Sequence, residues 1–247
     1  MAYSSIAKPE DYFNTKLTTG TGSSQAVTGV GFQPDWIWGK RRDSSGNNSL
    51  FDSVRGITKG LESNGTGAEF TSTDYYSSFD SDGFTIAAGS SGAGNGSSQT
   101  AVQWCWLGAN GTASNSDGSI TSTVSANTTA GFSIVSYSGS TNSTFTVGHG
   151  LGAVPKIFIL KKRSSSGTNW VMYNANLGND KRIQLNNTDA SASTTGFGST
   201  DPTSSVFTVA NGSTTGADGQ TYIAYCFAEK KGYSKFGRYT GNGDANG

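Results

Sequence analysis

The chain has 247 residues, of which 33% are hydrophobic, 14% are charged and 35 are Gly. Its 17 basic residues balance 17 acidic ones, so it lacks the excess positive charge on which non-specific nucleic-acid binding depends. No apolar run approaches the roughly 20 residues that cross a bilayer, and the first residues lack the basic and then apolar pattern of an export signal. We therefore expect no nucleic-acid partner, no membrane insertion and no export by a signal peptide.

Abundant Ser, Thr and Gly disfavour helices, whereas 13 Phe, 10 Tyr and 5 Trp are enough to build an ordered core. In the first half of the chain, short alternating or apolar runs bounded by small polar residues predict strands at 35–41, 49–54, 83–88 and 99–107. The second half predicts strands at 156–162, 169–173, 206–210 and 220–228. Helical periodicity is absent, which favours an all-β fold of sandwich or jelly-roll type.

Polar segments separate these strands. Residues 89–98 and 189–201 are rich in Gly, Ser and Thr and are interpreted as surface loops of a sandwich. Residues 111–129 have the composition of a flexible linker. The boundary between two domains is therefore expected in this segment.

Two pairs of similar segments lie the same distance apart. The segment around Pro34 resembles the one around Pro155, and the segment around Cys105 resembles the one around Cys226, in both cases with an offset of 121 residues. A fixed offset between distant segments indicates a duplicated unit. We therefore expect two tandem β-sandwich units of jelly-roll type, at residues 1–125 and 126–247.

A shorter element occurs three times, at 17–22, 135–139 and 237–241. In its first two copies it opens a unit and leads into the strand that follows the proline. The third copy has no such continuation in this sequence. Residues 232–247 are therefore either the opening strand of a third unit or a last strand that pairs at the edge of the second unit.

Few residues could support catalysis. His149 is the only histidine, and no Gly-x-Ser-x-Gly motif supplies a nucleophile for it, which favours a structural or solvent-exposed role. Cys105 and Cys226 lie in aromatic, strand-like runs and are interpreted as buried thiols rather than a disulfide. Together these three residues cannot complete a zinc site. The nearest pair of glutamates, Glu62 and Glu69, has no counterpart in the second unit. We expect no enzyme activity, no cofactor and no metal.

Calcium is the one metal with a partial sequence signal. Asp80 and Asp82 precede Gly83 with a spacing used in calcium loops, but the closing Glu of such a loop is missing. An Asp-rich hairpin turn is therefore favoured over a calcium site.

Two groups of aromatic residues could bind carbohydrate. Four tryptophans alternate along two predicted strands: Trp36, Trp38, Trp104 and Trp106. The second unit replaces them by other apolar residues, so core packing is favoured for them. Tyr75 and Tyr76 lie in a polar, loop-like segment and are the candidate ligand contacts, with ordinary half-buried tyrosines as the alternative.

A basic turn occurs in both units, as Lys40-Arg41-Arg42 and as Lys161-Lys162-Arg163. Such turns could bind phosphate or an anionic polysaccharide. The favoured interpretation is a charged strand end that keeps a sheet edge from pairing with another sheet.

The motifs Gly-Phe-x-Pro-Asp-Trp-x-Trp at 31–38, Phe-Asp-Ser-Val-Arg-Gly at 51–56, Phe-Asp-Ser-Asp-Gly-Phe at 79–84 and Tyr-Ile-Ala-Tyr-Cys-Phe-Ala-Glu at 222–229 form a set. The set resembles a family of repeated, concanavalin-like domains of uncharacterised function in virion proteins of marine tailed phages. The resemblance covers nearly the whole chain. It implies a non-enzymatic structural protein at the virion surface, as a tail fibre or spike or as a capsid decoration or fibre subunit.

The partners that this resemblance implies are other virion proteins, further copies of the chain and host-surface polysaccharide. Two alternatives remain from different functional classes. The first is a free lectin-like module whose loop aromatics stack on sugars. The second is a polysaccharide depolymerase, which the lack of a repeated acid pair disfavours.

Overall fold

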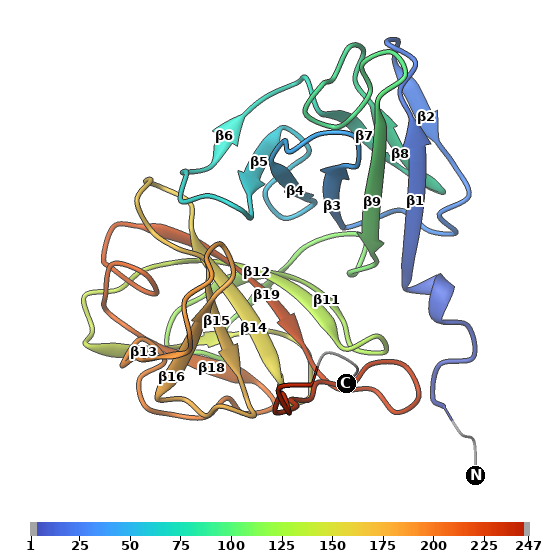
Figure 1. Ribbon diagram of the computed structural model, residues 1–247. Coiled ribbons are helices and arrows are strands. Elements are labelled where there is room, and N and C mark those ends of the chain that lie inside the picture. The colour runs from blue at the N-terminus through green and yellow to red at the C-terminus, as the bar shows by residue number, and fades with distance from the viewer. Residues whose placement is uncertain (1–3, 245–247) are drawn as a thin grey trace.

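Residues 4–244 are described by this computed structural model, and their regular secondary structure is almost entirely β-strand (Figure 1). The one helix among them is the 3-10 turn η1 (Pro9–Asp11). In this part of the chain no helix has the length and apolar character needed to cross a membrane. The expected all-β class is confirmed.

The first half of the chain forms a sandwich of two antiparallel sheets. One sheet has six strands, in the order β1 (Phe13–Thr19), β9 (Thr100–Trp106), β3 (Trp36–Arg41), β4 (Asn48–Asp52), β5 (Lys59–Glu62) and β6 (Phe70–Thr71). The other has three strands, in the order β2 (Gln25–Val27), β8 (Gly83–Ile86) and β7 (Tyr76–Asp80). Alternate residues of both sheets, such as Ile37 and Phe84, point inward and form the core of this first sandwich.

The second half also forms one large sheet and one small sheet. Its large sheet has the order β10 (Ala113–Asn115), β11 (Ser122–Asn127), β12 (Phe132–Ser138), β19 (Thr221–Phe227), β14 (Ile157–Lys162), β15 (Val171–Asn174), β16 (Lys181–Gln184) and β17 (Ala192–Ser193). Its small sheet pairs β13 (Thr144–Gly148) with β18 (Val206–Ala210). The core of this second sandwich lies between the two sheets.

Strand pairing keeps the 121-residue offset found in the sequence. In the first sandwich β3 pairs with β9 so that Ile37 lies opposite Cys105. In the second, β14 pairs with β19 so that Phe158 lies opposite Cys226. All four side chains are buried in the core of their own sandwich. The two anchors of the sequence repeat thus lie in neighbouring strands of both large sheets.

The segment expected to be a linker is a structured part of the second sandwich. Residues 111–129 contain β10 and β11, and β11 pairs with β12 along five residue pairs, with Val124 opposite Val135. No local pattern marks β11 as a strand, because Val124 is its one large apolar residue. The hydrogen-bonded ladder with β12 stabilises it instead. The structural boundary therefore lies before β10 rather than near residue 125.

The segment after β19 forms no strand in the described residues. Lys230 and Ser234 form an isolated bridge, and residues 235–244 have no regular structure. Neither predicted role for 232–247, a third opening strand or an edge strand of the second unit, is present in residues 232–244. Residues 245–247 lie outside the described part of the chain.

Candidate functional site

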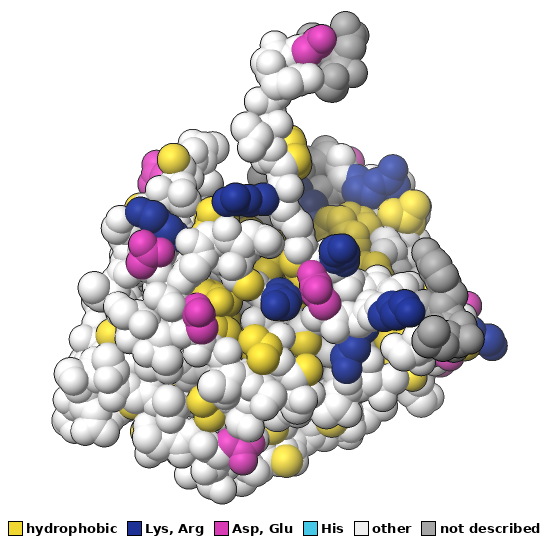
Figure 2. All heavy atoms as spheres, turned by 90° about the horizontal axis from the view of Figure 1, so that it is seen from below, with side chains coloured by type: hydrophobic (Ala, Val, Ile, Leu, Met, Phe, Trp, Pro, Cys, Tyr) yellow, Lys and Arg dark blue, Asp and Glu magenta, His cyan; other side chains and the backbone are white. Residues whose placement is uncertain are grey.

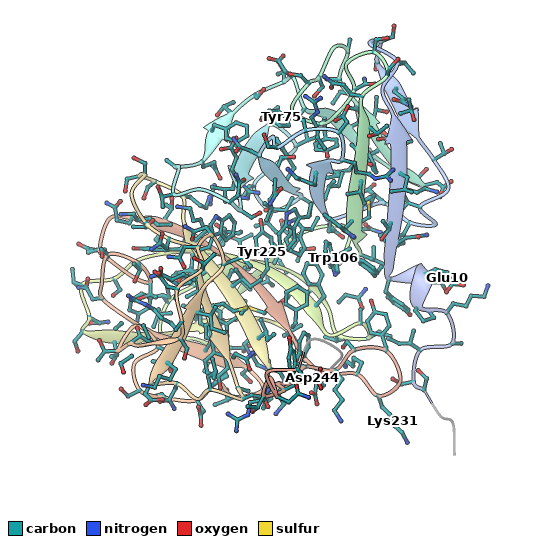
Figure 3. All side chains as sticks on the ribbon, in the orientation of Figure 1. Glu10, Tyr75, Trp106, Tyr225, Lys231 and Asp244 are labelled. Atoms are coloured by element: carbon teal, nitrogen blue, oxygen red, sulfur yellow. The ribbon has the colours of Figure 1, made fainter. Side chains whose placement is uncertain are left out.

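A third apolar core joins the two sandwiches, between the large sheet of the first and the large sheet of the second. Trp36 lies in this core with 1% exposure, and its ring stacks on Tyr225 with 4.2 Å between centroids. Trp106 and Phe132 also pack against the Trp36 ring. Figure 3 shows Tyr225 and Trp106 in the layer between the sandwiches. Core packing is confirmed for Trp36.

A buried polar network crosses the same interface. Arg55 Nε donates to Asp52 Oδ2 over 2.5 Å, and both side chains are 0% exposed. From the second sandwich, the Tyr225 hydroxyl donates to Asp52 over 2.7 Å and accepts from Arg55 over 3.2 Å. Arg163 donates to both carboxylate oxygens of Glu69, over 2.7 and 3.1 Å. We call these five residues the interface network.

The interface network has the residue types of an active site, but its position makes it structural. Burial raises the pKa of the Tyr225 phenol well above its ordinary value. Burial would also raise the pKa of Glu69, yet hydrogen bonds and charge from Arg163, with a smaller effect of Arg55, lower it below 4.5. Tyr225 therefore stays neutral and Glu69 ionised at neutral pH. With Asp52 and Arg55 fully buried, the network holds the sandwiches together and cannot meet a substrate.

Lys161 is a further buried charge at this interface. Its side chain is 0% exposed, and Nζ donates to the carbonyl of Thr168 over 2.9 Å and, across the interface, to that of Thr66 over 3.4 Å. Burial, with the charge of Lys162, lowers the pKa of Lys161 to about 8. The favoured interpretation of the second basic turn was wrong, because the first sandwich covers it and no exposed strand end remains.

His149 and the two cysteines have structural positions. His149 is fully buried, with Nε2 3.2 Å from the carbonyl of Thr203, and Nδ1 accepts from the amide of Leu151. Burial lowers the pKa of His149, so the ring is neutral at pH 7. Cys105 and Cys226 are free and buried, as expected. None of these three side chains is available to a substrate.

The aspartates of the β7–β8 turn have separate partners. Asp82 accepts from the amides of Gly29 and Gly31 over 2.8 and 2.7 Å, and Asp80 accepts from the Thr85 hydroxyl over 2.7 Å. The two carboxylates thus stabilise the hairpin and an adjacent loop, as the favoured turn interpretation predicts. Within residues 4–244 no three His, Cys, Asp or Glu side chains gather in a way that could hold a metal ion.

The structure separates the two candidate ligand contacts. Tyr76 is 0% exposed in the core of the first sandwich, and its hydroxyl lies so close to Gly39 that a Cβ there would be 2.5 Å away. It offers no surface to a ligand. Tyr75 is half-buried and packs against Phe51 and Phe70, with ring centroids 5.1 and 5.4 Å apart. Both rings contact Phe51, since the Tyr76 ring centroid also lies 5.2 Å from it, but only Tyr75, just before β7, is partly exposed.

Tyr75 lines a pocket at the loop end of the first sandwich, away from the interface (Figure 3). The pocket has a volume of about 220 Å³ and is lined by Arg41, Gly46, Asn47, Tyr75, Ser91 and Gly92. Gly92 lies directly against the Tyr75 ring, since a Cβ there would be 2.4 Å from it. Arg41 is partly exposed and pairs with Asp43 over 3.1 Å. The aromatic candidate and the first basic turn therefore meet at one site, which we call the Tyr75 pocket.

A second pocket, in the second sandwich, shares part of the lining of the Tyr75 pocket by the repeat offset, although Lys162, Gly167 and Thr168, the counterparts of Arg41, Gly46 and Asn47, do not line it. Adding 121 to Tyr75, Ser91 and Gly92 gives Gly196, Gly212 and Ser213, and all three line a polar pocket of about 600 Å³. Arg182 and Asp180 supply its charged groups. No aromatic residue marks this pocket in the sequence, because Gly196 stands where the offset places the counterpart of Tyr75. The repeat offset applied to Tyr75 is the signal that leads to it.

A third cavity, of about 290 Å³, lies where the sandwiches meet near the chain ends. Its walls are aromatic, and Phe13, Trp106, Phe132, Phe227, Tyr233 and Phe236 contribute to them. Figure 2 shows hydrophobic side chains gathered on this face among Lys and Arg. The segment after β19 thus packs against the body as far as Phe236.

Fold and sites together define an all-β protein of two stacked sandwiches with polar pockets at their loop ends. The sequence model of the domain of unknown function DUF7483 matches residues 8–247, and the chain belongs to that family. No curated protein and no solved structure has a significant match to it.

Proposed function

We propose that the chain is a duplicated jelly-roll sandwich of concanavalin-like type that acts, without catalysis, as a display and adhesion protein at the surface of a tailed-phage particle. The duplication rests on the register shared by β3·β9 and β14·β19. The virion setting, as fibre, spike or capsid decoration among other virion proteins, rests on the sequence resemblance. Host-surface polysaccharide is the proposed ligand.

The observation that supports adhesion is that both sandwiches have a polar pocket at their loops, with three lining residues of one related to three of the other by the 121-residue offset. Both pockets lie on loops, where binding residues can vary while the sheets keep their packing. In the Tyr75 pocket a half-buried aromatic ring lies beside a guanidinium, an amide and a hydroxyl. This combination suits a sugar that carries hydroxyl and carboxylate or sulfate groups.

One carboxylate of the nearest glutamate pair is engaged elsewhere, and of the two loop pockets only the second has an acidic residue, Asp180. A glycosidase holds its two acids on either side of the sugar, in contact with it. Glu69, one member of the nearest glutamate pair, is bound by Arg163 and Arg55 at the interface between the sandwiches. The Tyr75 pocket is lined by no acidic residue. These positions support binding rather than turnover.

Replacing Tyr75 by Ala or Arg41 by Gln is expected to weaken binding to an acidic host polysaccharide about tenfold, because each change removes one of the two strongest contacts of the pocket. Titration calorimetry against that polysaccharide measures the effect. Tyr12→Ala is the matched control, since Tyr12 is also half-buried but lies outside the pocket.

Equal affinities in all four proteins would contradict adhesion through this pocket. Release of new reducing ends from the polysaccharide would contradict the non-enzymatic assignment. The virion setting has its own test, which is to locate the chain on purified particles by electron microscopy. Absence from particles together with retained sugar binding would replace this proposal by a free lectin-like module.

A further inference from the structure

Strand β1 has a free edge. It pairs with β9 on one side, and no strand of residues 4–244 pairs with it on the other. The amide of Gly20 donates to the carbonyl of Gln99, and the amide of Leu107 donates to the carbonyl of Tyr12. The backbone groups of the even-numbered residues of β1 therefore form the hydrogen bonds with β9. The N–H and C=O of Leu17 therefore point away from the sheet. Leu17 is also 65% exposed, so an apolar side chain lies in solvent at this free edge.

The corresponding edge of the second sandwich is covered. Aligning β1 with β12 through their pairing with β9 and β19 makes Ser136 the counterpart of Leu17. The outer edge of β12 binds β11, which places Thr123 opposite Ser136. Because β11 belongs to the segment that follows β9, the chain leaving the first sandwich completes the sheet of the second.

The segment that follows β19 leaves the second sandwich in the same way, and by the 121-residue offset its residues 237–243 correspond to 116–122, which lead into β11. Beyond Phe236, residues 237–243 form no strand and are exposed, although Arg238 donates to the carbonyl of Asn176 over 3.3 Å. Tyr239 is 93% exposed, and Figure 2 shows this end of the described chain standing away from the body. The edge of β12 is already covered, whereas the equivalent edge of β1 is open in the described chain.

We propose that residues 237–243 of one copy add as a strand to the free edge of β1 in a second copy, as β11 adds to β12. Main-chain hydrogen bonds would then form at Leu17, and Tyr239 would pack beside its side chain. Among residues 4–244 three large hydrophobic residues are exposed, Leu17, Tyr239 and Val154, and this contact covers the first two. Donor and acceptor are different surfaces, so copies assemble head to tail into rings or open chains. The inference does not depend on sugar binding.

Light scattering coupled to size-exclusion chromatography tests this on the full chain. We expect oligomers whose mass rises with concentration. Leu17→Pro should abolish them, because it removes an outward N–H and leaves the β1–β9 hydrogen bonds in place. Deleting 237–247 should abolish them as well. Val154→Ser is the control, since it removes the third exposed hydrophobic residue and should leave assembly unchanged.

Mixing the two defective chains gives the sharper result. The Leu17→Pro chain keeps the donor segment and the deleted chain keeps the free edge, so together they should form a one-to-one dimer and nothing larger. Circular dichroism spectra that match the parent chain would show that both variants are folded. A full chain that stays monomeric, or oligomers that persist in either variant, would overturn the proposal.

Discussion

Replacing Arg55 by Met is expected to lower the free energy of unfolding by about 3–5 kcal/mol, because the change leaves the Asp52 carboxylate buried without its cation. Arg55 also donates to the carbonyl of Leu50 over 3.0 Å and to the Tyr225 hydroxyl, so the same substitution removes a contact between the sandwiches. Urea denaturation followed by tryptophan fluorescence measures the loss. Trp36, which stacks on Tyr225, reports directly on this interface.

Arg41→Met is the matched control for this effect. Arg41 pairs with Asp43 over 3.1 Å, but the two side chains are 20% and 33% exposed, so water screens the pair. Its loss should cost no more than about 1 kcal/mol. Replacing Asp52 by Leu together with Arg55 should cost less than Arg55→Met alone, because no charge is then left unpaired. Equal losses for Arg55→Met and Arg41→Met would refute the structural role of the interface network.

Replacing Lys161 by Met is expected to change how stability depends on pH. The pKa of Lys161 is about 8 in the folded chain and about 10.5 when unfolded. Below pH 8 both states are protonated and the buried charge costs its full amount, up to about 3 kcal/mol. Between pH 8 and 10.5 the folded lysine is neutral while the unfolded one is charged, so this cost decreases as the pH rises. The stability of Lys161→Met relative to the parent chain should therefore be greatest below pH 8 and decrease towards pH 10.

The measurement is the difference in unfolding free energy between the two proteins at each pH. A difference is needed because burial also raises the pKa of Cys105 and Cys226, whose titration alters the stability of both proteins equally. Lys40→Met is the control, since this counterpart 121 residues earlier is half-exposed. A pH-independent difference for Lys161→Met would show that its amine is solvated.

Strands with large alternating side chains could be predicted from the sequence, and strands stabilised by their neighbours could not. The eight predicted strands, among them 35–41 and 99–107, are all present within a few residues. Both of these carry alternating tryptophans, of which Trp36 is buried and the others are partly buried. By contrast β11, with mostly small polar residues, is held by its ladder with β12. Such pairing joins residues distant in sequence and leaves no local pattern.

The interface between the sandwiches was also beyond local sequence analysis. Alternation shows that Trp36 and Ile37 face opposite sides of β3, but not that both sides are covered. In the sequence Asp52 and Arg55 stand out only as part of a motif. Nothing local indicates that their partner is Tyr225, which lies 173 residues from Asp52. Likewise, Tyr75 and Tyr76 are alike in sequence, and only the position of β7 decides which ring is buried.

The claim on which the rest depends is that one sandwich is encoded twice, and oxidative cross-linking tests it most directly. Ile37→Cys lies opposite Cys105 and Phe158→Cys opposite Cys226, at cross-strand distances that a disulfide can span. Each variant should form its own disulfide, detected by mass spectrometry, while Trp38→Cys and Ile159→Cys, one residue along and on the other face, should not. Cross-linking at one position only, or in the control variants, would contradict the duplication.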